Sequence, residues 1–128
     1  MLFSADFETI TDENDCRVWT WGICDIPYTF ANFGNSIESF FEHLKTLKEN
    51  SKIYFHNLKF DGSFILNYLL SNGYTWVKGK QDLKMNTFTT MISEDIKYYN
   101  ISFYVNKKVK VDIYDSLKII NLTVEQIA

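Results

Sequence analysis

The run Leu2-Phe3-Ser4-Ala5-Asp6-Phe7-Glu8, near the start of the 128-residue chain, predicts a buried β-strand over residues 2–7. Side chains two residues apart on a strand point to the same face. We therefore expect Asp6 and Glu8 to project together while Phe7 enters the core between them. The polar residues 11–15 lead into an aromatic-rich strand at 17–26 and predict a hairpin.

The remainder of the chain mixes helical and strand patterns. Pro27 ends the second strand, and residues 28–33 are expected to form a short third strand. Asn35 is the expected cap of a helix with apolar residues at helical spacing. A strand at 53–56, a loop at 57–59 and a helix at 60–70 follow, the helix closed by Asn72-Gly73. Strands at 88–93, 96–105 and 108–114 precede a final helical segment, capped by Asp115 or Ser116 and ending at residue 126.

This order predicts one α/β domain over residues 1–128, with a mixed sheet flanked by helices. It fits a ribonuclease-H-like fold. A hydrophobic content of 46% is ordinary for a globular protein. The net charge of −3 and the pI near 5.3 argue against bulk electrostatic capture of nucleic acid.

The cysteine and histidine content excludes two further classes of protein. Two cysteines, Cys16 and Cys24, and two histidines do not make a zinc module or a disulfide framework. A charged residue comes too early for a signal peptide, and no apolar run approaches transmembrane length. We therefore expect a soluble cytoplasmic protein that has no membrane partner.

Asp6, Glu8 and Asp61 are the candidate catalytic and metal-binding residues. Two-metal cleavage of phosphodiesters needs hard oxygen ligands that converge on one point, and Mg²⁺ prefers carboxylates and water. An isolated Asp-x-Glu pair is weak support, because many surface strands carry one. Asp61 lies in the second motif, His56-Asn57-Leu58-Lys59-Phe60-Asp61-Gly62, which strengthens the interpretation.

Together with Asp6-Phe7-Glu8-Thr9 and Tyr114-Asp115-Ser116-Leu117-Lys118, that motif resembles the N-terminal 3′–5′ proofreading exonuclease domain of phage protein-primed family B DNA polymerases. Cys16-Arg17-Val18-Trp19 and Tyr54-Phe55-His56 also resemble this family. The resemblance spans nearly the whole chain. It implies a DnaQ-like exonuclease fold, a two-metal site for Mg²⁺ or Mn²⁺, single-stranded DNA as partner, and the cytoplasm of a phage-infected or element-bearing bacterium.

The resemblance also implies contacts with the 3′ end of single-stranded DNA. The residues concerned are Thr9, Asn57 and Phe60, together with Tyr54, His56, Phe64, Ser116 and Leu117. An amide can bond a phosphate or a base edge, and an aromatic ring can stack on a base. Each residue also has a purely structural interpretation. The two phenylalanines can be core residues, Asn57 and Ser116 helix caps, Thr9 and His56 strand residues, and Asp61 a carboxylate placed by the helix dipole.

The third exonuclease motif of the family, a Tyr-x-x-x-Asp that supplies a further carboxylate and a tyrosine, does not occur in this chain. The C-terminal part of the domain is therefore expected to be missing and hydrolysis to be weak or undetectable. Asp112 is expected on the solvent face of its strand and Asp115 at a helix cap, so neither is an expected replacement ligand.

Two functions remain open at this point. One is an exonuclease-like domain, either cut from a polymerase or a minimal nuclease completed by a partner or by a homodimer that covers an exposed sheet face. The alternative is a non-catalytic phage or mobile-element protein that uses the same fold to bind and inhibit a host defence or replication protein.

Overall fold

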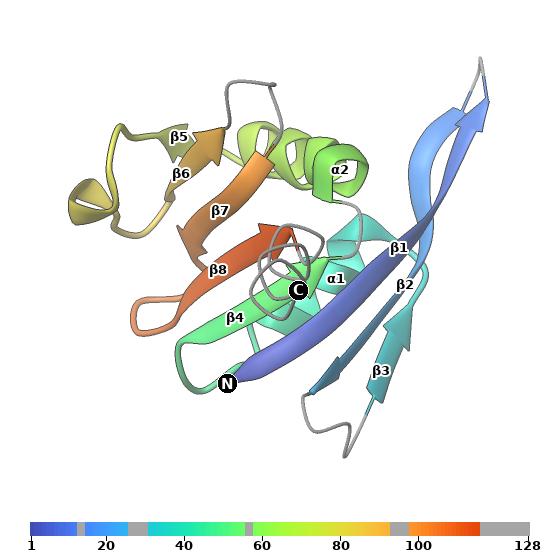
Figure 1. The fold of residues 1–128 in the computed structure, drawn as a ribbon, viewed down its shortest axis with the longest axis horizontal. Coiled ribbons are helices and arrows are strands. Elements are labelled where there is room, and N and C mark those ends of the chain that lie inside the picture. Colours follow the sequence, from blue (N-terminus) through green and yellow to red (C-terminus); the bar gives the residue numbers. More distant parts are fainter. Residues whose placement is uncertain (13–14, 26–30, 56–57, 93–97, 116–128) are drawn as a thin grey trace, which may run out of the picture.

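The computed structural model describes residues 1–12, 15–25, 31–55, 58–92 and 98–115, whose strands form one eight-stranded sheet (Figure 1). The strand order is β3-β2-β1-β4-β8-β7-β6-β5. The strands are β1 (Leu2–Asp12), β2 (Asp15–Asp25), β3 (Ala31–Gly34), β4 (Ser51–Phe55), β5 (Thr75–Trp76), β6 (Thr87–Ile92), β7 (Tyr98–Tyr104) and β8 (Lys110–Asp115). The helices are α1 (Ile37–Leu44) and α2 (Leu58–Ser71), and a single 3-10 turn spans Lys80–Asp82.

β1 and β2 form the expected antiparallel hairpin, and both strands are longer than the pattern predicted. Asp6 lies opposite Gly22 and Glu8 opposite Thr20, with a register shift directly after Glu8. On its other side β1 pairs in parallel with β4, and this pairing ends where Ala5 meets Phe55. β4 pairs in parallel with β8, whereas β2–β3, β6–β7 and β7–β8 are antiparallel. The sheet is therefore mixed, as expected.

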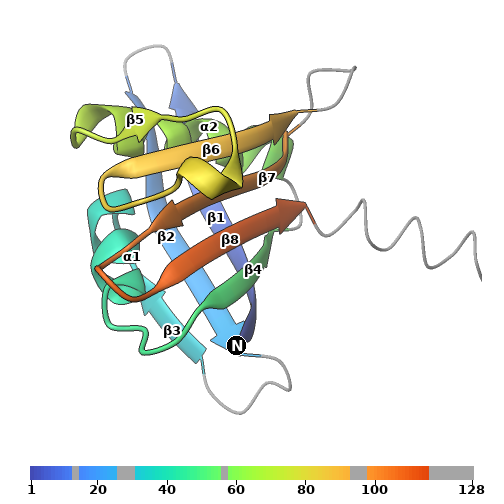
Figure 2. The same ribbon diagram turned by 90° about the vertical axis from the view of Figure 1, so that its left-hand side faces the viewer.

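Both helices pack on one face of the sheet (Figures 1 and 2). On this face Phe7 is buried, and its ring lies edge-on to Phe40 of α1 at 5.0 Å and to Phe55 of β4 at 4.8 Å between ring centroids. The helices meet where Phe41 stacks on Tyr68 at 3.9 Å. The opposite face of the sheet, here called the open face, carries neither helix, and Asp6 and Glu8 point to it. The alternation predicted for β1 is confirmed.

The helix boundaries differ from the prediction in two places. The cap of α1 is Ser36 rather than Asn35, because the Ser36 hydroxyl accepts a hydrogen bond from the Ser39 N–H at 3.1 Å and the Ser39 hydroxyl accepts one from the Ser36 N–H at 3.3 Å. α2 begins at Leu58, inside the expected loop, and Leu58 is fully buried. Burial of this side chain explains the earlier start. Gly73 ends α2 with φ +83°, the left-handed conformation expected there.

β5 and the 3-10 turn, which connect α2 to β6, were not predicted from the sequence. The final helical segment lies outside the described residues except for Asp115, which is the last residue of β8. Within the described ranges, no helix is both long and apolar enough to cross a membrane.

Candidate active site

The candidate site forms where β4 stops and β1 continues. Beyond Ala5, β1 has β2 as its neighbour on one side, and the strand on its other side has ended at Phe55. The chain leaves β4 and enters α2 at Leu58, so Asp61 falls in the first turn of the helix. A carboxylate is favourable there because the helix dipole is positive at its N-terminus. The topology thus brings Asp61 from a distant part of the sequence to the segment of β1 that carries Asp6 and Glu8.

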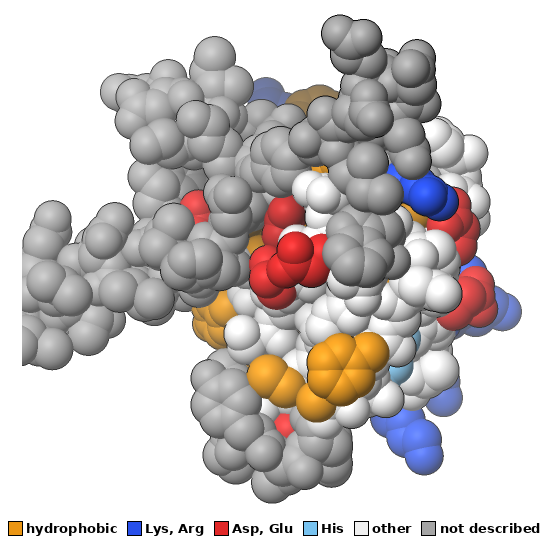
Figure 3. Space-filling model, turned by 90° about the vertical axis from the view of Figure 1, so that its right-hand side faces the viewer, with side chains coloured by type: hydrophobic (Ala, Val, Ile, Leu, Met, Phe, Trp, Pro, Cys, Tyr) orange, Lys and Arg blue, Asp and Glu red, His pale blue; other side chains and the backbone are white. Residues whose placement is uncertain are grey.

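Asp6 and Glu8 are exposed on the open face of the sheet and line the same shallow hollow of about 260 Å³. Figure 3 shows acidic side chains gathered on this side of the molecule, beside an exposed hydrophobic patch. The hollow also includes Phe33 of the edge strand β3. The expectation that the two carboxylates project together is confirmed.

Asp61 is 3% exposed, in contrast to the other two carboxylates. Burial raises the pKa of its carboxyl group to about 7, and the nearby charges of Asp6 and Glu8 act in the same direction. A hydrogen bond from the backbone of Phe7 opposes this rise in pKa. The second oxygen, Oδ2, is buried without a hydrogen-bond partner. The site therefore concentrates negative charge around an oxygen whose bonding capacity is unused.

These features match a divalent cation in two respects. Carboxylate oxygens are the ligands that Mg²⁺ prefers, and a buried oxygen without a partner is costly unless something binds it. The side-chain positions are less favourable: among the described residues, no three Asp, Glu, His or Cys side chains lie close enough to hold one ion together. The donor set thus suits a metal, whereas the side-chain arrangement does not form a closed three-ligand cage.

The other predicted DNA-binding residues are spread over the fold. Tyr54 lies on the open face, where its ring stacks against Tyr114 at 5.6 Å. Thr9 follows the irregularity in β1 and is half-buried. Phe64 is partly buried and packs against the core, which agrees with its structural interpretation. Phe60 belongs to α2, but its side chain is outside the described part of the structure. The predictions for His56, Asn57, Ser116 and Leu117 also fall outside the described residues.

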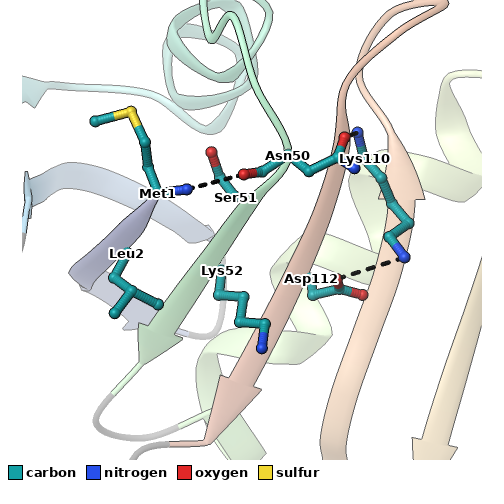
Figure 4. Close-up of a pocket in the computed structure, with 7 residues that line it drawn as sticks. All are labelled: Met1, Leu2, Asn50, Ser51, Lys52, Lys110 and Asp112. Carbon is teal, nitrogen blue, oxygen red and sulfur yellow. Dashed lines mark hydrogen bonds and ion pairs between the residues drawn. The ribbon is translucent and has the colours of Figure 1, made fainter.

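Asp112 is not solvent-exposed, contrary to the sequence expectation. It is 7% exposed because the Ser102 hydroxyl donates a hydrogen bond to it and two lysines approach it. The Nζ atoms of Lys80 and Lys110 lie 3.6 and 3.8 Å from its carboxylate oxygens. Figure 4 shows the Lys110 pair in a separate hollow of about 360 Å³ at the start of β1 and β4. Asp112 already has cationic partners and belongs to a different part of the sheet from Asp6.

Two residues at the site were not singled out from the sequence as functional. Gly22 lies opposite Asp6 on β2, and Phe33 lies opposite Gly22 on β3. The pattern of the third strand did not reveal them, because their proximity to Asp6 depends on strand register. Pairing the hairpin residue by residue outward from its turn would place Trp21 rather than Gly22 opposite Asp6, because the register shifts by one residue between Glu8 and Thr9.

Known proteins related to the chain were found by sequence and by structure. DNA polymerases of Bacillus phages PZA and phi29 are each 40% identical to the chain in an alignment of 132 positions. The alignment covers 99% of this chain and 22% of each polymerase. The DNA polymerase of Streptococcus phage Cp-1 is 32% identical over 140 residues. Phi29 DNA polymerase complexed with single-stranded DNA superposes with a TM-score of 0.81 at 38% identity, covering 91% of this chain and 21% of that one. No family model matches the chain.

The chain therefore spans about 22% of the length of these relatives. The structural match confirms the expected mixed α/β fold and agrees with its assignment as ribonuclease-H-like. The chain corresponds over nearly its whole length to the N-terminal region of phi29-type phage DNA polymerases.

Proposed function

We propose that this domain binds the 3′ end of single-stranded DNA together with divalent metal, and that Asp6, Glu8 and Asp61 form its 3′–5′ exonuclease-type site. The observation that carries the proposal is the buried, unpartnered Oδ2 of Asp61 beside two exposed carboxylates. Related structures support the partner, because phi29 DNA polymerase is known in complex with single-stranded and with primer-template DNA.

Asp6, Glu8 and Asp61 would hold Mg²⁺ or Mn²⁺. Such an ion supplies a water of lowered pKa and neutralises charge on the phosphate. Asp6 and Glu8 present their oxygens to the open face, where a strand can approach. Asp61 holds its carboxyl group inside the end of the sheet, with one oxygen fixed by the backbone of Phe7. Hydrolysis by these residues is expected to be slow, because no three described side chains converge on one ion.

The test separates metal binding, DNA binding and cleavage. Mn²⁺ should raise the melting temperature of the protein, because an ion that binds the folded state alone stabilises it. An Asp6→Ala, Glu8→Ala double variant should lose this shift, whereas Asp82→Ala, which alters an exposed carboxylate on the 3-10 turn, should retain it.

A 5′-labelled single strand incubated with Mn²⁺ should bind and should shorten slowly from its 3′ end, and the double variant should not shorten it. Rapid degradation by the wild type would show that the carboxylates assemble more fully than their positions indicate. A wild-type protein that binds neither Mn²⁺ nor single strands would overturn the proposal and favour the non-catalytic inhibitor of a host protein.

A further inference from the structure

Asp6, Gly22 and Phe33 form one row across three neighbouring strands. Asp6 of β1 pairs with Gly22 of β2, and Gly22 pairs with Phe33 of β3. Residues directly opposite each other in antiparallel strands present their side chains on the same face. The ring of Phe33 and the carboxylate of Asp6 therefore share the open face, two strand spacings or about 10 Å apart across the sheet.

Phe33 is 78% exposed, the highest value among the large hydrophobic side chains of the described residues. Its ring nevertheless has a fixed support. A Cβ atom built on Gly22 would lie 3.5 Å from the Cδ1 and Cε1 atoms of Phe33, so the ring rests over the glycine backbone. Covering a strand glycine with a cross-strand aromatic ring stabilises a sheet, which explains the position of the ring. It does not explain why most of its surface is in solvent next to a cluster of carboxylates.

Two hollows adjoin this row, and each has a volume of about 260 Å³. Asp6, Gly22 and Phe33 line both of them. One extends to Glu8 and the other to Cys24. A flat apolar ring fits such surfaces, and the carboxylates would repel a phosphate placed there without a cation. The aromatic side of the site therefore suits a base, and the carboxylate side suits a metal-bound phosphate.

We propose that Phe33 is a stacking platform for an unpaired nucleobase of the DNA strand whose 3′ end lies at Asp6 and Glu8. This inference rests on the proposed function, because it places the strand at the same site. Base–aromatic stacking is strong enough that loss of the ring should weaken binding by about tenfold. Because the ring is already held against Gly22, little side-chain freedom is lost when a base stacks on it.

The experiment uses the full chain with Ca²⁺ in place of Mn²⁺, and a single-stranded oligonucleotide carrying 2-aminopurine near its 3′ end. Phe33→Leu keeps an apolar cover on Gly22 but removes the aromatic face. It should weaken binding about tenfold and abolish the quenching of 2-aminopurine that stacking causes. Phe33→Trp should restore both. The matched control is Trp76→Leu, which removes an exposed aromatic residue (52% exposed) at the opposite edge of the sheet and should change neither.

Separate outcomes distinguish the stacking platform from the proposed function. If Phe33→Leu binds and quenches like the wild type while the Asp6→Ala, Glu8→Ala variant loses its Mn²⁺-dependent stabilisation, the platform is refuted and the metal site stands. If Phe33→Leu also loses the Mn²⁺ shift or melts well below the wild type, Phe33 is a structural residue and the platform is again refuted. If the wild type binds no single strand, both proposals fail.

Discussion

Replacing Asp61 with Asn should remove a pH-dependent component of stability. The pKa of the Asp61 carboxyl group is about 7 in the folded protein and about 3.9 in an unfolded chain, so the folded state keeps a proton that the unfolded state releases. A raised carboxyl pKa stabilises the fold fully below about pH 4, and this stabilisation is lost as the pH rises through 7. Each pKa unit corresponds to about 1.36 kcal/mol, which gives about 4 kcal/mol in total.

Asparagine has nearly the same shape and cannot ionise. Between roughly pH 4 and pH 8 the wild type should lose about 4 kcal/mol of unfolding free energy through ionisation of Asp61, and Asp61→Asn should not. The free energy of unfolding of the variant minus that of the wild type should therefore rise by about 4 kcal/mol over this range. Urea denaturation in EDTA, followed by tryptophan fluorescence, measures this difference in the free energy of unfolding. Asp82→Asn, on the exposed 3-10 turn, is the matched control and should differ from the wild type by less than about 0.5 kcal/mol at every pH. Parallel pH profiles for Asp61→Asn and the wild type would refute this account of the buried carboxyl group.

Two further substitutions test the packing that supports the site. Gly34→Ala should lower the free energy of unfolding by about 1–3 kcal/mol, because the added alanine Cβ would lie 2.3 Å from the indole ring of Trp21. Gly22→Ala, whose nearest contacts are at 3.5 Å, is the control in the same urea titration, and equal stabilities would contradict the clash. Asp112→Ala should cost about 1.5–3 kcal/mol in thermal unfolding, because it removes a hydrogen bond to a charged group and leaves the Ser102 hydroxyl only Asn100 Oδ1, at 2.9 Å, as acceptor. A melting temperature like that of the wild type would show that the pair contributes nothing.

The parts of the fold that depend on local pattern were predictable from the sequence. Alternation in β1 correctly placed Phe7 in the core and the two carboxylates on the other face, because strand geometry has a period of two residues. Gly73 marked the end of α2 because the left-handed conformation favours glycine. The hairpin followed from a polar turn between two apolar runs.

The features that depend on contacts between distant segments were not predictable in this way. Asp112 points away from the helices, as alternation requires, but Lys80 from the connection between β5 and β6 lies beside it and Ser102 of β7 bonds to it. The approach of Phe33 to Asp6 is set by the registers of two strand pairs. No local pattern contains this information.

The alternation of β1 has a consequence for which mutations this domain can tolerate. The two-residue alternation that directs the side chain of Phe7 into the core directs Asp6 and Glu8 to the opposite face, so a change of register moves the core residue and the candidate site together. Inserting one residue between Ala5 and Asp6 would turn both carboxylates toward the helices and Phe7 toward solvent. Point substitutions of Asp6 or Glu8 do not change this alternation. Natural variation in this segment should therefore keep its length constant, because an insertion would displace the core residue and both site residues at once.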